Sequence, residues 1–385
     1  DGSTQASDVV NIWLNRIGFS PQEIQNYKDG KTINWEDYEF QQGLRQDHNL
    51  SVGGSAKNVT YYWSLGYTDN EGYVFNDRFT AIRSRLNLEA EINSWLKVGT
   101  NTQIATKDQS PIPSGTDLLN VTPYSDFYDP DGVTLAFAPT GNISASRHPY
   151  LELEYRDRFY KLNSATSKIY GTVSLPFNIS FTSEFIPSIA QNREFNHWTS
   201  AHPEWGREGG RANRINYSNY YWQVNNILKW NKDFGKHTFD LTFVQNAEKY
   251  QEWWEETRRN NFQPSDNLGF HQLGAATQDV AISSNDQVET ADALLGRLNY
   301  TFNSKYMVTA SARRDGYSAF GQQNPHGTFG SVALGWLVSD EPFFNMKGLD
   351  LLKIRLSFGT NGNRSIGRYS ALSDLSTGRY VQIIN

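Results

Sequence analysis

Bulky aromatic side chains gather in segments of this chain that are otherwise polar and rich in turn-forming residues. Such rings could stack on sugar rings or hold a partner, because loops on a rigid scaffold carry much of a protein's binding surface. They could equally pack loop against loop or lie at a membrane interface, and both interpretations stay open. The candidate ligand-binding residues are Tyr124, Phe127, Tyr128, Trp198, Trp205, Trp254 and Phe262.

A second set of candidates consists of charged residues that alternate with apolar ones. Between Phe79 and Ile92 the apolar side chains fall on one face and the charged ones on the other, a separation that only a β-strand produces. The charged face predicts a hydrated interior, where these groups contact another part of the protein or pair with each other. The residues are Arg83, Arg85, Glu89, Glu91 and, far along the chain, Lys353 and Arg355.

Other kinds of site find little support in the sequence. The chain has no cysteine, and its seven histidines are scattered without metal-ligand spacing. Asp129-Pro130-Asp131-Gly132 resembles the start of a calcium loop but lacks the later acidic ligand, so we predict a simple turn. A net charge of −6 argues against nucleic-acid binding. We therefore predict no catalytic residue, no metal and no cofactor.

The elements that position these residues are predicted to be strands with connections of two alternating kinds. Short connections with turn-forming residues, such as the one from Gly53-Gly54-Ser55 onward and Asn303-Ser304, alternate with long ones, such as 107–163 and 255–290. Strict alternation places every long loop at one end of an up-and-down antiparallel sheet. We predict thirteen strands, at 46–52, 59–68, 79–92, 95–106, 164–175, 179–194, 214–231, 237–254, 291–303, 305–314, 327–338, 351–359 and 379–384.

These strands predict an all-β fold, a transmembrane antiparallel up-and-down β-barrel over residues 46–385. Residues 1–45 are predicted to be a polar lead-in or extracellular loop with a short helix that Ser20 caps. A mean hydropathy of −0.63 is compatible with a barrel, because only alternate residues face lipid. A soluble sandwich or propeller gives the same alternation, but the runs 214–231 and 237–254 are long for soluble strands.

Two blocks of the chain, in the same order, resemble the SusC/RagA family of TonB-dependent outer-membrane transporters from Bacteroidetes. The first block is Trp35-Glu36-Asp37, Gln46-Asp47-His48-Asn49-Leu50-Ser51-Val52-Gly53-Gly54, Tyr61-Tyr62-Trp63-Ser64-Leu65-Gly66-Tyr67 and Asn70-Glu71-Gly72. The second is Arg313-Arg314-Asp315-Gly316, Ser339-Asp340-Glu341-Pro342-Phe343 and Leu352-Lys353-Ile354-Arg355-Leu356-Ser357-Phe358-Gly359.

The resemblance implies a barrel of roughly 22 strands around a plug, so about 13 strands make a partial barrel. We expect the plug domain to be absent here, and further strands to follow Asn385. The family implies a location in the cell outer membrane and energised import of oligosaccharides or peptides, without an enzymatic step. Its implied partners are a SusD-like surface lipoprotein as a lid, outer-membrane lipid, and the TonB complex through a missing N-terminal region. The charged interior face would then contact the plug.

Two alternatives remain open at this point. One is a soluble, secreted all-β module that binds or degrades carbohydrate, which the eleven tryptophans favour. The other is a passive porin without a plug. If the apolar faces of the strands point outward in a band with aromatic residues at its rims, the transporter is favoured. If they point into a shared core, the soluble module is favoured.

Overall fold

One antiparallel sheet of twelve strands makes up most of the part of the chain that the structure describes. The structure is a computed structural model that describes residues 2–115, 120–142, 146–262, 265–321, 324–364 and 366–369. The strands are β1 (Leu44–Ala56), β2 (Val59–Glu71), β3 (Arg78–Glu91), β4 (Leu96–Asp108), β5 (Arg156–Leu175), β6 (Ile179–Trp198), β7 (Arg211–Phe234), β8 (His237–Asn260), β9 (Gln278–Phe302), β10 (Tyr306–Tyr317), β11 (His326–Leu337) and β12 (Lys353–Gly359).

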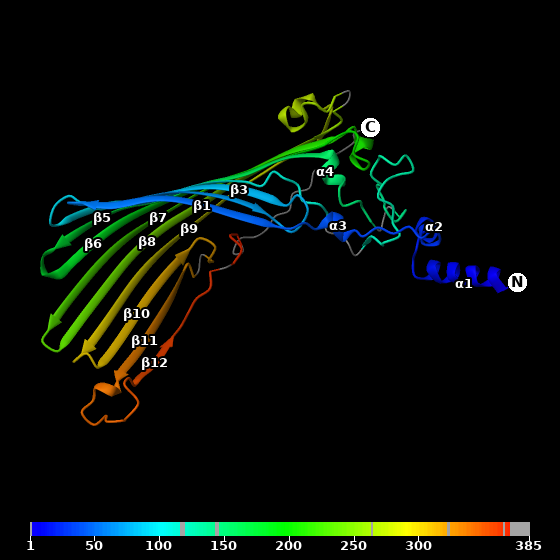
Figure 1. Ribbon diagram of the computed structural model, residues 1–385. Helices are drawn as coiled ribbons and strands as arrows, with labels where there is room; N and C mark the ends of the chain where they lie inside the picture. Colours follow the sequence, from blue (N-terminus) through cyan, green and yellow to red (C-terminus); the bar gives the residue numbers. More distant parts are fainter. Residues whose placement is uncertain are drawn as a thin grey trace.

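The strands follow one another in the sheet in the order in which they occur in the chain, β1 to β12. Figure 1 shows that they form a curved sheet, as in the wall of a barrel. The predicted all-β, antiparallel up-and-down fold is confirmed. Twelve of the thirteen predicted strands are present, and the thirteenth, at 379–384, lies outside the described residues.

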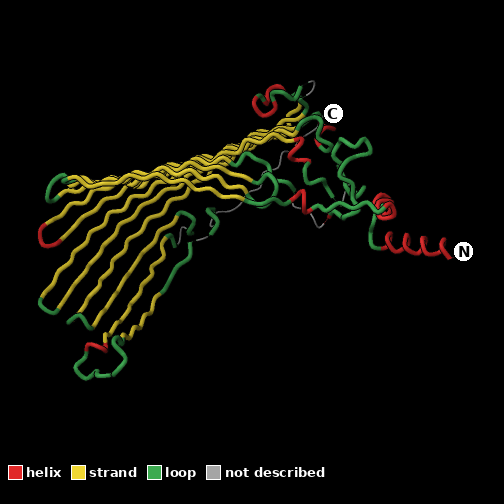
Figure 2. The backbone as a smooth tube through the Cα atoms, viewed as in Figure 1, coloured by secondary structure: helices red, strands yellow, loops and turns green. Residues whose placement is uncertain are grey.

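Among the described residues, helices are confined to the N-terminal segment and to the connections between strands (Figure 2). They are α1 (Gly2–Arg16), α2 (Pro21–Asp29), α3 (Glu36–Glu39) and α4 (Leu151–Tyr155), with short 3-10 turns η2 (Pro176–Asn178), η3 (Trp205–Glu208), η4 (Gly269–His271), η5 (Leu273–Ala275) and η6 (Val338–Asp340). The helix predicted after Ser20 is confirmed, with Ser20 and Glu23 capping each other. Among the described residues, no helix has both the length and the apolar character needed to cross a bilayer.

Short and long connections alternate along the sheet as predicted. The short ones are 57–58, 92–95, 176–178, 235–236 and 303–305, and 338–352 is a longer member of that series. The long ones are 72–77, 109–155, 199–210, 261–277 and 318–325. The short turns lie at the end of the sheet remote from α1 to α4 (Figure 1). All the long loops therefore gather at one rim, which we call the long-loop rim.

The first short turn differs from its prediction. Gly53 and Gly54 are part of β1, where they pair with Tyr62 and Tyr61, and the turn itself is Lys57-Asn58. A Cβ atom on Gly54 would lie only 2.8 Å from the hydroxyl oxygen of Tyr61, so the absent side chain makes room for that ring. Glycine here serves the close approach of a cross-strand aromatic ring and does not mark a turn.

The apolar face of the sheet is open and carries no second layer among the described residues. Leu334, Ile354 and Leu356 are 49%, 52% and 70% exposed, although they alternate with polar residues as a core-facing set would. No shared core of the kind that a soluble sandwich needs is formed on this face by the described residues. An exposed apolar face of this extent fits the hydrocarbon of a bilayer.

Aromatic rings border this face near the short turns of β7 to β11. Neighbouring rings in the series have their centroids 4.8 to 6.4 Å apart. Tryptophan and tyrosine are favoured at this position because one part of the ring system is apolar and another is wet. The rings belong to Trp230, Phe234, His237, Phe239, Tyr300, Phe302, Tyr306, Trp336 and Phe343.

Candidate functional site at the long-loop rim

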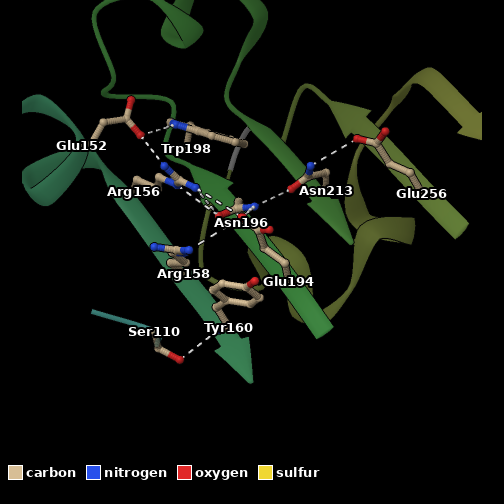
Figure 3. A network of polar contacts seen from close by, with 10 residues as sticks. All are labelled: Ser110, Glu152, Arg156, Arg158, Tyr160, Glu194, Asn196, Trp198, Asn213 and Glu256. Atoms are coloured by element: carbon tan, nitrogen blue, oxygen red, sulfur yellow. Dashed lines mark hydrogen bonds and ion pairs between the residues drawn. The ribbon is translucent and has the colours of Figure 1, made fainter. Parts of the chain in front are cut away.

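A polar network ties together the ends of β5, β6, β7 and β8 at the long-loop rim (Figure 3). Arg156 donates from Nε and Nη2 to the side-chain oxygen of Asn196, at 3.1 and 2.6 Å. Asn196 donates in turn to Asn213 at 3.0 Å, and Asn213 donates to Glu256 at 3.2 Å. Because each residue sits on the next strand, the network fixes the spacing of four strands where the loops leave the sheet.

Glu152 of α4 joins the long loop 109–155 to this network. One of its oxygens accepts from Arg156 Nη1 and from the indole nitrogen of Trp198, each at 2.9 Å. Burial alone would raise the pKa of Glu152, but contacts with His202 and Trp198 and the charge of Arg156 lower it to about 2. The carboxylate therefore stays ionised and holds α4 on the rim.

The two predicted rim tryptophans lie near each other, but guanidinium groups of the chain cover them. The rings of Trp198 and Trp205 have centroids 6.3 Å apart. Arg211 lies 3.6 Å from the centre of the Trp205 ring, and Arg156 lies 4.8 Å from that of Trp198. These cation–π contacts occupy ring faces that a ligand would need.

Phe262 is buried in a small apolar cluster beneath two rim loops. It is 2% exposed and packs with Phe195 of β6, Ala212 of β7 and Phe270 of η4. The edge of the His197 ring also meets it, with centroids 5.3 Å apart. This position matches the loop-packing interpretation, because no face of the ring is open to a ligand.

Phe127 and Tyr128 line a cavity of about 460 Å³ in the loop 109–155. Tyr128 is 47% exposed, whereas Phe127 is stacked on Trp35 with a centroid separation of 5.6 Å. The third predicted aromatic of this loop, Tyr124, lies elsewhere and packs on Phe19 and Tyr27. The other residues that line the cavity are Tyr38, Val133, Leu135, Tyr150, Leu153, Glu154 and Tyr155.

Tyr38, Tyr150 and Tyr155, the other aromatic residues of the cavity, carry little signal in the sequence. Tyr38 precedes β1, whereas Tyr150 and Tyr155 lie at the two ends of α4, and no periodic pattern links them. Tyr150 donates from its hydroxyl to the backbone oxygen of Tyr38, which closes the loop against α3. Only the folded loop brings these rings together.

Trp254 lies on the polar face of β8, opposite Tyr217 of β7 and Asn285 of β9. Because side chains alternate along a strand, its neighbour Trp253 points to the other face. Glu252 and Tyr250 lie on the same polar face of β8 as Trp254. The Trp254 ring therefore continues this row of polar side chains towards the long-loop rim.

The charged residues that the alternation singled out form ion pairs across neighbouring strands. Lys97 lies 2.9 Å from Glu89 and 3.5 Å from Glu91, and Tyr170 donates to Glu89 at 2.7 Å. Arg83 donates to Thr68 at 2.6 Å and lies 3.7 Å from Asp47.

The three other members of this set lie on the polar side of their strands. Arg85 lies 3.4 Å from Gln103. Lys353 and Arg355 face the same side of β12, where Arg355 pairs with Gly335 of β11. The contacts of the charged set are thus mainly cross-strand pairs, as in a hydrated lumen.

Asp131 makes the predicted turn, because its carboxylate accepts from the backbone nitrogens of Val133 and Thr134, each at 2.9 Å. In the part of the chain that the structure describes, no group of three or more histidine, aspartate or glutamate side chains is arranged to hold a metal ion. The chemistry of this rim is that of ring stacking, hydrogen bonding and ion pairing.

Acidification is expected to loosen the loop around His148. This ring is buried beside Phe127 and Trp35, its Nδ1 accepts from the Tyr150 backbone nitrogen, and burial lowers the pKa of His148 to about 4. The contribution of the neutral His148 ring to the stability of the loop is therefore fully present above pH ~6.5. It is lost as the pH falls towards 4, because over this range the opened loop binds a proton at His148 and the closed loop does not. The loss reaches up to about 3 kcal/mol.

Amide exchange of residues 120–142 between pH 7 and pH 4, corrected for the intrinsic pH dependence of exchange, measures this loss. The variant His148→Leu serves as the control, because it has no proton to gain. If His148→Leu loosens over the same pH range as the wild type, another group is responsible.

An open antiparallel meander with a polar face, an exposed apolar face and all its long loops at one end is the wall of an outer-membrane β-barrel. No protein-family model matches the chain. Among proteins of known annotation, the chain is 28% identical over 399 residues to the TonB-dependent receptor P39 of Formosa agariphila. It is 26% identical over 378 residues to the TonB-dependent receptor SusC of Bacteroides thetaiotaomicron.

Solved structures show the same fold. The RagAB peptide transporter matches with a TM-score of 0.77 at 21% sequence identity, over 88% of this chain and 39% of that one. The match to P39 covers all of this chain but 36% of P39, and the match to SusC covers 86% of this chain and 35% of SusC. The chain therefore spans about a third of the length of these relatives.

These matches confirm the resemblance that the motifs indicated: over most of its length the chain is similar to TonB-dependent receptors of the SusC/RagA type. The predicted location in the outer membrane of a Gram-negative bacterium is confirmed with it.

Proposed function

We propose that the chain forms part of the substrate-facing wall and outer rim of a TonB-dependent importer of oligosaccharides or peptides. The observation that carries this proposal is the aromatic cavity of about 460 Å³, which opens at the long-loop rim of a sheet whose apolar face is exposed. Cavities lined by aromatic rings with a few polar groups are typical of small-molecule sites, and tyrosine offers both a ring and a hydroxyl.

The partners belong to this proposal as well. A SusD-like surface lipoprotein would cover the long-loop rim as a lid, and the TonB complex would supply energy through a region outside this chain. The name of the RagAB peptide transporter supports a peptide as cargo, and the family resemblance of the sequence motifs leaves an oligosaccharide equally open. The proposal involves binding and passage, with no chemical change to the cargo.

We expect the substitution Tyr128→Ala to weaken uptake of the cargo. Tyr128 is the most open of the cavity rings that were predicted from the sequence, and a ring contact of about 0.5–1.5 kcal/mol corresponds to an apparent affinity lower by roughly threefold to tenfold. The measurement is concentration-dependent uptake of labelled oligosaccharide and peptide pools by cells that express the full-length transporter and its neighbouring lipoprotein.

The matched control is Phe177→Ala, which removes an exposed ring at the opposite end of the sheet. Uptake that depends on the cavity is lowered by the first substitution and unchanged by the second. Equal uptake by the two variants would contradict a role of the cavity in binding the cargo. Uptake that persists when TonB is deleted would indicate a passive porin.

A further inference from the structure

The segment that follows β12 folds back onto the polar face of the sheet, three to four strands away from β12 in the sheet order. It leaves β12 at Gly359, where the nitrogen of Thr360 donates to the Gly330 oxygen at 2.9 Å. It then reaches β8 and β9 through Arg364, Arg368 and Tyr369. We call residues 360–364 and 366–369 the inner strap, which Figure 1 draws in red beyond the end of β12.

Arg368 is the main anchor of the inner strap. Its Nη1 lies 2.6 Å from Glu252 of β8, its Nε lies 2.9 Å from Glu289 of β9, and the Gln287 side-chain oxygen also accepts from it. The guanidinium lies 4.9 Å from the centre of the Tyr250 ring. Three acceptors and a ring face around one guanidinium make a nearly complete binding site for such a group.

Arg364 makes a second contact of the same kind. Its Nη1 lies 2.5 Å from Glu248 of β8, and its guanidinium lies 5.7 Å from the centre of the Tyr317 ring. Arg364 is about half exposed, whereas Glu248 is largely buried. The carboxylate is therefore part of the wall, and the arginine is the component that can leave.

Tyrosine hydroxyls hold the three carboxylates in place independently of the inner strap. Tyr217 and Tyr250 donate to Glu252 at 2.9 and 3.0 Å. Tyr221 donates to Glu248, and Tyr317 donates to Glu289, each at 2.9 Å. We call the seven residues Tyr217, Tyr221, Glu248, Tyr250, Glu252, Glu289 and Tyr317 the Tyr–Glu wall.

The free edge of β9 explains why the inner strap can lie here. β10 ends at Tyr317, opposite Ala291, so the part of β9 that precedes Ala291 has no strand on that side among the described residues. The Val288 nitrogen on this edge donates to the Tyr369 hydroxyl at 3.2 Å. Among the described residues, the strap meets this edge through this one side-chain hydrogen bond and not through a strand ladder, so little backbone pairing has to break when the strap departs.

We propose that the inner strap is an internal pseudo-ligand: its two arginines occupy a cation-binding patch, the Tyr–Glu wall, from which a cationic peptide displaces them. The proposal deepens the proposed function, on which it rests, by naming a class of cargo. Fixed carboxylates flanked by tyrosine rings bind guanidinium or ammonium groups through charge and through the ring faces together. Removing the arginines without replacement leaves three carboxylates on the same face of β8 and β9 without these cations, so a cation favours the open state.

The test uses the purified full-length transporter, with tetra-arginine as the probe and tetra-glutamate of the same length as its control. In the wild type, tetra-arginine is expected to raise amide exchange in residues 360–369, and tetra-glutamate is expected to leave it unchanged. The double variant Arg364→Gln/Arg368→Gln removes the competitor, so tetra-arginine is expected to bind it at least tenfold more tightly.

Two further variants make the result decisive. Glu252→Gln/Glu289→Gln is expected to lose tetra-arginine binding, whereas Lys57→Gln/Lys236→Gln removes two cations at the short turns and is expected to bind as the wild type does. Heat-modified gel mobility confirms that each variant is folded. The inference is overturned if tetra-arginine leaves strap exchange unchanged, or if the double arginine variant binds it no more tightly.

Binding and exchange on the purified protein need no import. Strap displacement without any uptake in cells would therefore count against the proposed function alone.

Discussion

Replacing Leu334 with arginine is expected to destabilise the folded barrel in a bilayer by about 1–2 kcal/mol, which is below the cost at the membrane centre because Leu334 lies two residues from the aromatic border at Trp336. Leu334 lies on the apolar face of β11 between Val308 of β10 and Leu356 of β12, and it is 49% exposed. In water the same substitution at an exposed position would change stability by less than about 0.5 kcal/mol. The size of the destabilisation therefore distinguishes a face that contacts lipid from one that contacts water.

The adjacent residue supplies the control. Ala333 points to the polar face, where Thr309 and Ser357 are its cross-strand partners, so Ala333→Arg is expected to be tolerated. Denaturant titrations of both full-length variants in liposomes give the two free energies. Equal losses would contradict a lipid-facing apolar surface and revive the soluble module.

The substitution Phe262→Ala is expected to loosen the rim loops 199–210 and 261–277 by about 3–5 kcal/mol. The ring is almost fully enclosed by Phe195, Ala212 and Phe270, so its removal leaves a cavity and loses apolar contacts. The loss stays local, because the sheet itself is held by strand pairing elsewhere. Amide exchange of the two loops in the full-length transporter measures it.

Leu268→Ala is the matched control for this prediction, since Leu268 lies in the same loop and is 46% exposed. Its effect is expected to stay within about 0.5 kcal/mol. If the two substitutions changed loop protection by the same amount, the apolar cluster would not be what holds the loops to the rim.

The architecture of the sheet could be predicted because it depends on local patterns. A period of two residues follows from strand geometry, and turn residues interrupt it at each reversal of the chain. In an up-and-down sheet, neighbours in sequence are also neighbours in space, so the order β1 to β12 needed no long-range information. Even so, the connection predicted to start at Gly53 and Gly54 starts later in the structure. These glycines belong to β1, where Gly54 makes room for the cross-strand ring of Tyr61.

The candidate site was less predictable, because it depends on contacts between distant segments. Phe262 and Tyr128 are both loop aromatics in the sequence, yet one is buried and the other is half exposed in a cavity. The difference comes from the loops that fold over them. Likewise, nothing near Arg368 in the sequence indicates that its partners are Glu252 and Glu289.

The consecutive order of the strands has a consequence for how the wall assembles. In the described sheet each strand pairs only with the strands before and after it in the chain, so for most strands a loop of a few residues has to close before pairing. The connection 109–155 between β4 and β5 is the longest among the described strands, but closure entropy grows by only about 0.6 kcal/mol for each doubling of loop length. Insertion into the membrane can therefore proceed hairpin by hairpin, with the slowest addition expected at β5.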